Sequence, residues 1–297
     1  MKIDLHIHSK DCSDGKMPLS QIFIEANKRG IDLISITDHD NIDCQESAAT
    51  LALENGMDYL TGVELNISFP HPAYRNGKPA SLDVLGYGYD SKNNELSMKL
   101  NEIREYRRSR AEKILEKLNQ AFVEEGLDVF TKRDMEAIEE RVEGSIGRPH
   151  IAAYLVEKGI VSSRQEAFDT YLVKCNIPKL PLSLEEASNL IRGAGGKLFL
   201  AHPDDPNGTS LRAFTSDIEE QQRIIKETML SFLDGIECWH FRHPPETVAS
   251  YSLFAEKEKL LISGGSDCHQ DPVVMGEVNI PSWVAEQFAE DINIAQK

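Results

Sequence analysis

The chain has 297 residues, of which 40% are hydrophobic and 27% are charged, and its 32 basic and 49 acidic residues give a net charge of −17. This composition is typical of a globular protein, and the length predicts either one large α/β barrel or two ordinary domains. The acidic balance argues against a broad nucleic-acid-binding surface. No apolar run reaches the roughly 18 residues that a membrane span needs, so we expect neither a signal peptide nor a membrane segment.

The cysteines are scattered along the chain and form no C-x-x-C pair. They are Cys12, Cys44, Cys175, Cys238 and Cys268. An odd number of separated cysteines favours reduced thiols over a disulfide framework. We therefore expect a cytoplasmic protein.

The stretch 3–15, read as IDLHIHSKDCSDG, begins with a strand pattern. Apolar residues at 3, 5 and 7 alternate with Asp4, His6 and His8, which is the period-two pattern of a strand with one buried face. The two imidazoles therefore point the same way, and the loop 9–15 carries Asp14 back towards them. Two histidines on one strand face and a loop carboxylate form half of a candidate metal site.

Alternating helical and strand patterns continue to about residue 90. We predict helices over 18–29 and 44–55, and strands over 33–37, 59–63 and 81–85. From there to about residue 196 only helical patterns occur, over 94–125, 132–140, 149–158, 164–173 and 184–192. Strand-to-strand spacing in α/β folds is about 30 residues, so this gap indicates a helical insertion. Strands resume at 197–201, 235–239 and 260–263.

Seven strands that are mostly separated by helices predict a parallel α/β architecture. Polar side chains recur at or just after the carboxyl ends of these strands: His6, His8, His39, Glu64, His202, Asp267 and His269. A β/α barrel gathers its strand ends around one axis, whereas an open sheet spreads them along an edge. We therefore predict a barrel formed by residues 1–90 and 195–297, with the helical insertion 91–194 covering its mouth.

Imidazole and carboxylate donors in this number suit zinc, manganese or iron, and magnesium less well. The set exceeds what one four-coordinate ion can use, which favours two or three divalent ions. A centre with several ions usually performs hydrolysis, since one ion activates water and its neighbours neutralise charge on a phosphoryl group. Any one of these histidines could instead be an ordinary hydrogen-bonded residue. Their joint position at strand ends is much harder to explain in that way.

Eight motifs occur in the order DLHIHSKDCSDG, ITDHD, TGVE, LGYG, GRPHIA, AHP, GIE and GSDCH, between Asp4 and His269. Together they resemble the PHP (polymerase and histidinol phosphatase) family, and within it the stand-alone branch of nucleotide phosphatases and exonucleases. The resemblance implies a distorted seven-stranded β/α barrel with a trinuclear metal centre.

The resemblance also implies the ligands of each ion. The first ion would bind His6, His8, Glu64 and Asp267. Glu64 would bridge to a second ion that also binds His202 and Asp83, and a third ion would bind Asp14, His39 and His269. The stand-alone branch usually has a histidine where this chain has Asp83. A carboxylate prefers harder ions, and the alternative interpretation of Asp83 is a carboxylate that supports a ligand.

Outside the ligand set, the resemblance places Arg148 and His150 of the GRPH motif over the barrel mouth. Arg148 would grip phosphate through two hydrogen bonds, and His150 would contact phosphate or protonate the leaving oxygen. The alternative is an exposed start of a helix. His243 is either a further phosphate contact or a loop histidine without a role, and His240 is interpreted as background.

These features predict a metal-dependent phosphoesterase that acts on a small phosphorylated substrate. The resemblance favours a nucleoside 3′,5′-bisphosphate that loses its 3′-phosphate, or the 5′ end of a short RNA. The alternatives are a histidinol-phosphatase-like enzyme and a catalytically inactive metal-binding regulatory module. An amidohydrolase-type barrel is a third class, but no lysine at a strand end is found for it.

Overall fold

The computed structural model describes residues 1–139, 146–178 and 180–293, and the last residue of the predicted helix 132–140 lies outside them. The chain forms two compact units. The first comprises Met1–Met98 and Pro181–Lys297, and the second is Lys99–Leu180. The second unit is narrower than the predicted insertion 91–194, because the helix Leu184–Gly193 belongs to the first unit.

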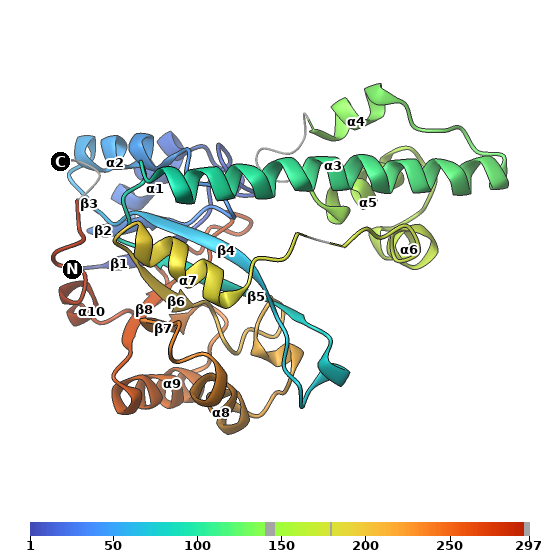
Figure 1. The fold of residues 1–297 in the computed structure, drawn as a ribbon. Coiled ribbons are helices and arrows are strands. Elements are labelled where there is room, and N and C mark those ends of the chain that lie inside the picture. Colours follow the sequence, from blue (N-terminus) through green and yellow to red (C-terminus); the bar gives the residue numbers. More distant parts are fainter. Residues whose placement is uncertain (140–145, 179, 294–297) are drawn as a thin grey trace. The chain divides into compact units, whose positions relative to one another are not determined.

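The first unit contains two sheets (Figure 1). The smaller sheet is parallel, in the order β1 (Ile3–Ile7), β2 (Leu33–Ile36) and β3 (Asp58–Tyr59). The larger sheet has the order β4 (Gly62–Phe69), β5 (Ala80–Tyr87), β6 (Lys197–Leu200), β7 (Gly235–His240) and β8 (Leu261–Gly265). Isolated parallel bridges, Ile7 with Cys268 and His39 with Glu64, connect the two sheets at the ends that carry polar side chains.

This architecture confirms a mixed α/β fold, whereas closure into a seven-stranded barrel stays a prediction. The predicted strand 59–63 is wrong, because the chain leaves the small sheet after Tyr59 and enters the large one at Gly62. The parallel arrangement is also wrong for β5, which pairs antiparallel with both β4 and β6. Only ten residues join β4 to β5, the length of a hairpin connection and too short for a helical crossover.

Helices of the first unit pack against these sheets or against one another (Figure 1). They are α1 (Leu19–Lys28), α2 (Gln45–Glu54), α7 (Leu184–Gly193), α8 (Ile218–Thr228), α9 (Pro245–Glu258) and the short α10 (Trp283–Glu286). In α1 the buried residues Leu19, Ile22, Phe23 and Ala26 follow helical spacing, so one face joins the core with α2, β2 and β3. Helix α9 lies along β7 and β8, which holds the ends of those strands in place.

The second unit is helical. Its helices are α3 (Asn94–Glu125, which starts in the first unit), α4 (Lys132–Glu139), α5 (Arg148–Glu157), α6 (Arg164–Ala167) and the π-helical turn η2 (Phe168–Leu172). They enclose a separate apolar core in which Phe122 contacts Phe130 and Tyr171 edge to face. That this unit covers a substrate site stays a prediction.

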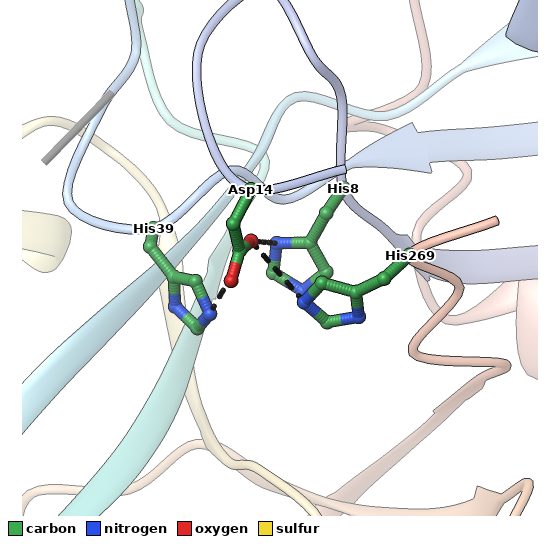
Figure 2. A group of neighbouring side chains, drawn as sticks. All are labelled: His8, Asp14, His39 and His269. Atoms are coloured by element: carbon green, nitrogen blue, oxygen red, sulfur yellow. Dashed lines mark ion pairs between the residues drawn. The ribbon is translucent and has the colours of Figure 1, made fainter. Parts of the chain in front are cut away.

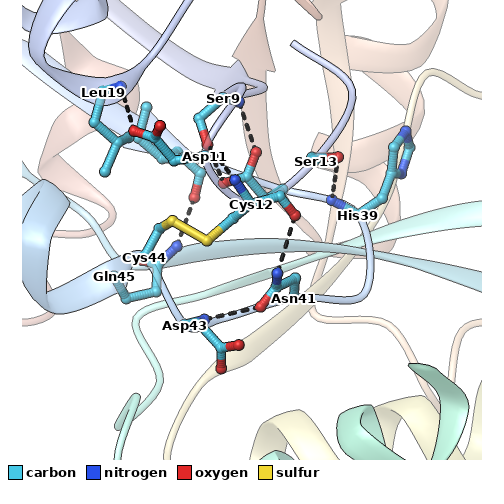
Figure 3. The surroundings of a disulfide bond; sticks show 12 residues. Ser9, Asp11, Cys12, Ser13, Leu19, His39, Asn41, Asp43, Cys44 and Gln45 are labelled. Carbon is cyan, nitrogen blue, oxygen red and sulfur yellow. Dashed lines mark hydrogen bonds between the residues drawn. A yellow bond between two sulfur atoms is a disulfide. The ribbon is translucent and has the colours of Figure 1, made fainter. Parts of the chain in front are cut away.

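A disulfide joins Cys12 to Cys44 across 32 positions of sequence (Figure 3). The expectation of reduced thiols is therefore wrong for these two residues, while Cys175, Cys238 and Cys268 are free and buried. The bond links the loop after β1 to the loop after β2, which only the parallel pairing of these strands brings together. The disulfide removes the reason, reduced cysteines, for which we predicted a cytoplasmic location, and that location stays a prediction.

Among the described residues, no helix combines the length and apolarity that crossing a bilayer requires.

Candidate metal centre

Strand β1 presents the first two candidate ligands. His6 and His8 point away from Ile3, Leu5 and Ile7, as the alternation predicts, but both histidines are also fully buried. The expectation of a single buried face is therefore wrong, because the other strand ends cover the polar side of β1. This burial removes the imidazoles from water and places them among carboxylates.

The first group of donors surrounds the Nε2 atoms of His6 and His8. Glu64 Oε2 lies 3.5 Å from His6 Nε2 and 3.3 Å from His8 Nε2. Asp267 Oδ1 lies at the same two distances, 3.5 and 3.3 Å. Four donors held about 2.1 Å from one tetrahedral ion are about 3.4 Å apart. The four imidazole-to-carboxylate distances therefore match the donor spacing around one small divalent ion, and His6, His8 and Asp267 form one donor group.

A second group combines His6, Glu64 and His202, whose donor atoms lie within 4.8 Å of one another. The other oxygen of the same carboxylate, Glu64 Oε1, is 3.0 Å from His202 Nε2. Asp83 lies nearby and accepts a 2.6 Å hydrogen bond from Asn66 Nδ2, and burial together with the Glu64 charge raises its pKa to about 6. Asp83 belongs to none of the donor groups found among the described residues, so its role as a ligand stays a prediction.

The third group comprises His8, Asp14, His39 and His269 (Figure 2). Asp14 Oδ1 lies 3.2 Å from His269 Nε2 and 4.0 Å from both His39 Nε2 and His8 Nδ1. These residues come from the ends of β1, β2 and β8 and from the loop after β1. The structure therefore brings together eight of the nine predicted ligands in overlapping groups: His6, His8, Asp14, His39, Glu64, His202, Asp267 and His269.

Buried polar atoms without a hydrogen-bond partner gather in this cluster. They include His6 Nε2, both ring nitrogens of His8, Glu64 Oε2 and His202 Nδ1. Such atoms are rare in native proteins, because each one costs about 1–3 kcal/mol of desolvation. Unpaired imidazole and carboxylate donors in one place are the set that divalent ions bind. The residues therefore fit a metal centre.

Neighbouring groups orient the candidate ligands. His6 Nδ1 lies 3.0 Å from Glu237 Oε1 and His269 Nδ1 lies 3.0 Å from the carbonyl of Asp267, so each Nδ1–H is a donor and each Nε2 keeps a lone pair. Asp38 accepts hydrogen bonds of 2.6 and 2.7 Å from the backbone and hydroxyl of Ser9, which braces the loop that carries Asp14.

The backbone conformation also helps to bring the candidate ligands together. His202 and Asp267 have positive φ angles of 22° and 52°, a conformation that costs about 1–3 kcal/mol for residues other than glycine and that clusters at functional sites. A Cβ atom at Gly265 would lie 2.2 Å from the Cβ of His6. The glycine therefore allows β8 to approach β1 closely enough for their donors to meet.

Charge governs the protonation of the cluster. Burial lowers the pKa values of His39 and His202, but the surrounding carboxylates, with Glu64 foremost, outweigh it and raise them to about 10 and about 9. Burial likewise opposes ionisation of Glu64 and Asp267, yet the imidazoles hold the pKa values of both well below their usual range. Protons and metal ions therefore compete for the same nitrogens.

The other predicted site residues are placed differently. Arg148 and His150 start α5 in the second unit, where the Arg148 guanidinium lies 5.5 Å from the centre of the Phe168 ring and His150 Nδ1 accepts a hydrogen bond from Gly147. Their contact with substrate stays a prediction.

His243 is buried in the first unit and uses both of its ring nitrogens. Nδ1 lies 3.0 Å from the carbonyl of Cys238 and Nε2 lies 3.4 Å from the amide of Asp204. Burial lowers its pKa to about 4, so the ring is neutral. The phosphate contact of His243 stays a prediction. Both ring nitrogens already have partners within the fold.

Sequence reasoning missed three residues at the edge of the cluster. Asp205 and His240 form a further group with Asp267, and Arg242 forms ion pairs with both aspartates. Asp205 follows β6, His240 ends β7 and Arg242 follows it, so the position at a strand end was the signal that could have identified them.

Comparison with known proteins assigns the family. The model of the PHP domain matches residues 4–171, more than half of the chain. The chain belongs to the PHP domain family, and it is a metal-dependent phosphoesterase. Both the predicted family and the predicted class of enzyme are thereby confirmed.

Particular relatives agree with this family. The chain is 30% identical over 276 residues to the 3′,5′-nucleoside bisphosphate phosphatase of Chromobacterium violaceum, covering 90% of this chain and 87% of that protein. It is 25% identical to the 5′-3′ exoribonuclease Rnm of Escherichia coli, covering 90% and 85%. A candidate metal-dependent phosphoesterase from Bifidobacterium adolescentis superimposes with a TM-score of 0.73 at 29% identity, covering 97% and 96%.

Proposed function

We propose that the chain hydrolyses a terminal phosphate ester of a small nucleotide, such as the 3′-phosphate of a nucleoside 3′,5′-bisphosphate, or acts at the 5′ end of a short RNA. The similarity to the bisphosphate phosphatase of Chromobacterium violaceum, which extends over most of both chains, supports the first substrate. The similarity to the exoribonuclease Rnm supports the second.

The observation that carries the proposal is the sharing of donors between groups. Glu64 directs one oxygen at His6 and His8 and the other at His202, and His8 also faces Asp14 of the third group. Donors shared in this way suit two or three neighbouring ions of manganese, zinc or iron, with magnesium as a weaker candidate. Such ions supply activated water and positive charge for the phosphoryl oxygens.

The chain itself holds and orients this centre. Glu237 fixes the ring of His6 so that Nε2 lies beside Glu64 and Asp267, and burial keeps bulk water away from His6 and His8. We assign binding of the substrate phosphate to Arg148 and protonation of the leaving oxygen to His150. Arg148→Ala then lowers kcat/KM by at least tenfold while the bound metal stays constant. An unchanged rate would remove Arg148 from the reaction.

The test of the function is release of phosphate from four substrates side by side, with manganese, zinc, iron and magnesium. The substrates are nucleoside 3′,5′-bisphosphates, 5′-phosphorylated RNA oligomers, histidinol phosphate and a cyclic ribose phosphate. We expect turnover of the nucleotide or RNA substrate that a chelator abolishes.

His39→Asn should abolish that turnover, and His71→Asn should not, since His71 is a buried histidine whose ring contacts Tyr74 and Phe214 outside the donor groups. Preferred hydrolysis of histidinol phosphate would contradict the nucleotide assignment. Absence of turnover with every ester and every ion would contradict the phosphoesterase itself.

A further inference from the structure

Two adjacent aspartates after β6 each hold an arginine, and the two pairs form a natural comparison. Asp205 accepts a 2.6 Å hydrogen bond from Arg242 Nη1, and Asp204 accepts a 2.7 Å hydrogen bond from Arg212 Nε. Both aspartate side chains are buried, at 1% and 2% exposure, while the arginine side chains are exposed at 39% and 38%. The pairs are thus alike in burial, and they differ in what each guanidinium faces.

Arg242 faces the metal centre. Its Nη1 atom also lies 3.4 Å from Asp267 Oδ2. The other oxygen of that carboxylate, Oδ1, lies between the Nε2 atoms of His6 and His8, where the first group of donors converges. The guanidinium is therefore separated from the ion-binding donors by a single carboxylate. Arg212, in contrast, contacts Asp204, which Gln221 and Thr247 also bind within the packing of α8 and α9.

His240, like Arg242, presents a hydrogen-bond donor to the Oδ2 atom of Asp267. Its Nδ1 accepts a 3.2 Å hydrogen bond from the backbone N–H of Arg242, so in the neutral ring the proton is on Nε2. That Nε2–H points at Asp267 Oδ2 from 3.5 Å and has no closer partner in the described part of the chain. A metal ion cannot use this nitrogen without breaking the bond to Arg242. The group formed by Asp205, His240 and Asp267 is therefore better suited to an anion beside the ions than to another ion.

We propose that Arg242 is a residue that recognises an oxyanion at the metal centre, and that Asp205 positions it. The inference rests on the proposed phosphoesterase function and names a residue that selects its substrate. Metal held by the donor groups that include Asp267 would take a share of the carboxylate charge and so weaken the 3.4 Å pair with Arg242. The shorter bond to buried Asp205 keeps the guanidinium in place. Arg242 then binds an oxygen of a tetrahedral phosphate that lies on the ions, so the site prefers esters with a doubly charged terminal phosphate.

The experiment measures anion binding and needs no turnover. The full-length protein is loaded with manganese, its metal content is determined, and inorganic phosphate is titrated into it by calorimetry. Arg242→Gln should weaken phosphate binding 10- to 100-fold with the metal content unchanged, because one charge-assisted hydrogen bond is lost. Arg242→Lys should recover part of the loss. The matched control Arg212→Gln should stay within twofold of the native protein.

Two results would overturn the inference. One is phosphate binding by Arg242→Gln within twofold of the native protein. The other is loss of metal from both Arg242→Gln and Arg242→Lys, which would give the guanidinium a structural role. If the native protein hydrolyses phosphate esters and Arg242→Gln binds phosphate normally, only this inference fails. If phosphate binding depends on Arg242 but no ester is hydrolysed, the proposed function fails and the anion site remains.

Discussion

Glu64→Gln is the substitution that most directly tests the metal centre. The Glu64 carboxylate is almost fully buried and lies 2.9 Å from His39 Nδ1, 3.0 Å from His202 Nε2, 3.3 Å from His8 Nε2 and 3.5 Å from His6 Nε2. Glutamine keeps the shape of the side chain but removes the charge and one acceptor. The substitution therefore isolates the electrostatic contribution of this residue from its packing.

The magnitude follows from His202. Burial lowers its pKa, and the carboxylates led by Glu64 nevertheless raise it from 6.5 to about 9. A difference of that size corresponds to about 3 kcal/mol, at 1.36 kcal/mol per pKa unit. With glutamine at position 64 we expect the pKa of His202 to fall by roughly two units in the metal-free protein. We also expect metal affinity to fall more than 100-fold, because removing only a supporting partner of a ligand costs about 10- to 100-fold.

Two measurements check this prediction. Histidine ring protons, followed by NMR against pH in chelator-treated protein, report the pKa of His202, and elemental analysis reports the ions retained. The matched control is Glu246→Gln, an exposed glutamate in the first turn of α9. If Glu64→Gln retained as many ions as the native protein, with affinity within threefold, Glu64 would not be a ligand and the shared-donor arrangement would be wrong.

Three further predictions address the surroundings of the centre. Glu237→Gln should lower metal affinity 10- to 100-fold without preventing saturation, because it releases His6 from its orientation, and competition with a chromophoric chelator measures this. The raised pKa values of His39 and His202, about 10 and about 9, stabilise the metal-free protein fully below pH 6.5, and this contribution is lost as pH rises to 9–10. The melting temperature of the metal-free protein should fall over that range. Metal affinity should rise over the same range, because binding releases protons that calorimetry in two buffers detects. A metal affinity that does not change with pH would contradict this prediction. Cys12→Ser/Cys44→Ser should cost up to about 3–4 kcal/mol for a loop spanning 32 positions, and reduction by a dithiol should lower the melting temperature equally.

The candidate ligands were predictable because one rule covers them. The carboxyl ends of parallel strands converge, so His8 after β1, His39 after β2 and His269 after β8 could be assigned to one place from their positions in the sequence alone. The rule needs only the apolar pattern of each strand and the polar residue that follows it. In this fold the isolated bridges between the two sheets bring those strand ends together, although closure of the barrel stays a prediction.

The parts that were not predicted depend on contacts that the local pattern does not contain. An apolar run has the same pattern in a parallel and an antiparallel strand, so the direction of β5 could be inferred only from its short connection to β4. The Cys12–Cys44 bond has the same origin, because it requires the loops after β1 and β2 to lie side by side. The number of cysteines in the sequence does not show which loops lie next to each other.

Three buried histidines show why residue type and position alone did not decide function. His6 donates its Nδ1–H to Glu237 and keeps a lone pair on Nε2, which suits it to bind a metal ion. His243 uses both nitrogens within the fold, which gives it a packing role. His240 accepts the backbone N–H of Arg242 at Nδ1 and so presents Nε2–H, which suits an anion. All three follow the same strand-end signal, and the partners of the two ring nitrogens separate them. Because that partner is a backbone or side-chain atom set by tertiary structure, the distinction between ligand, packing residue and anion contact arises only in the folded chain.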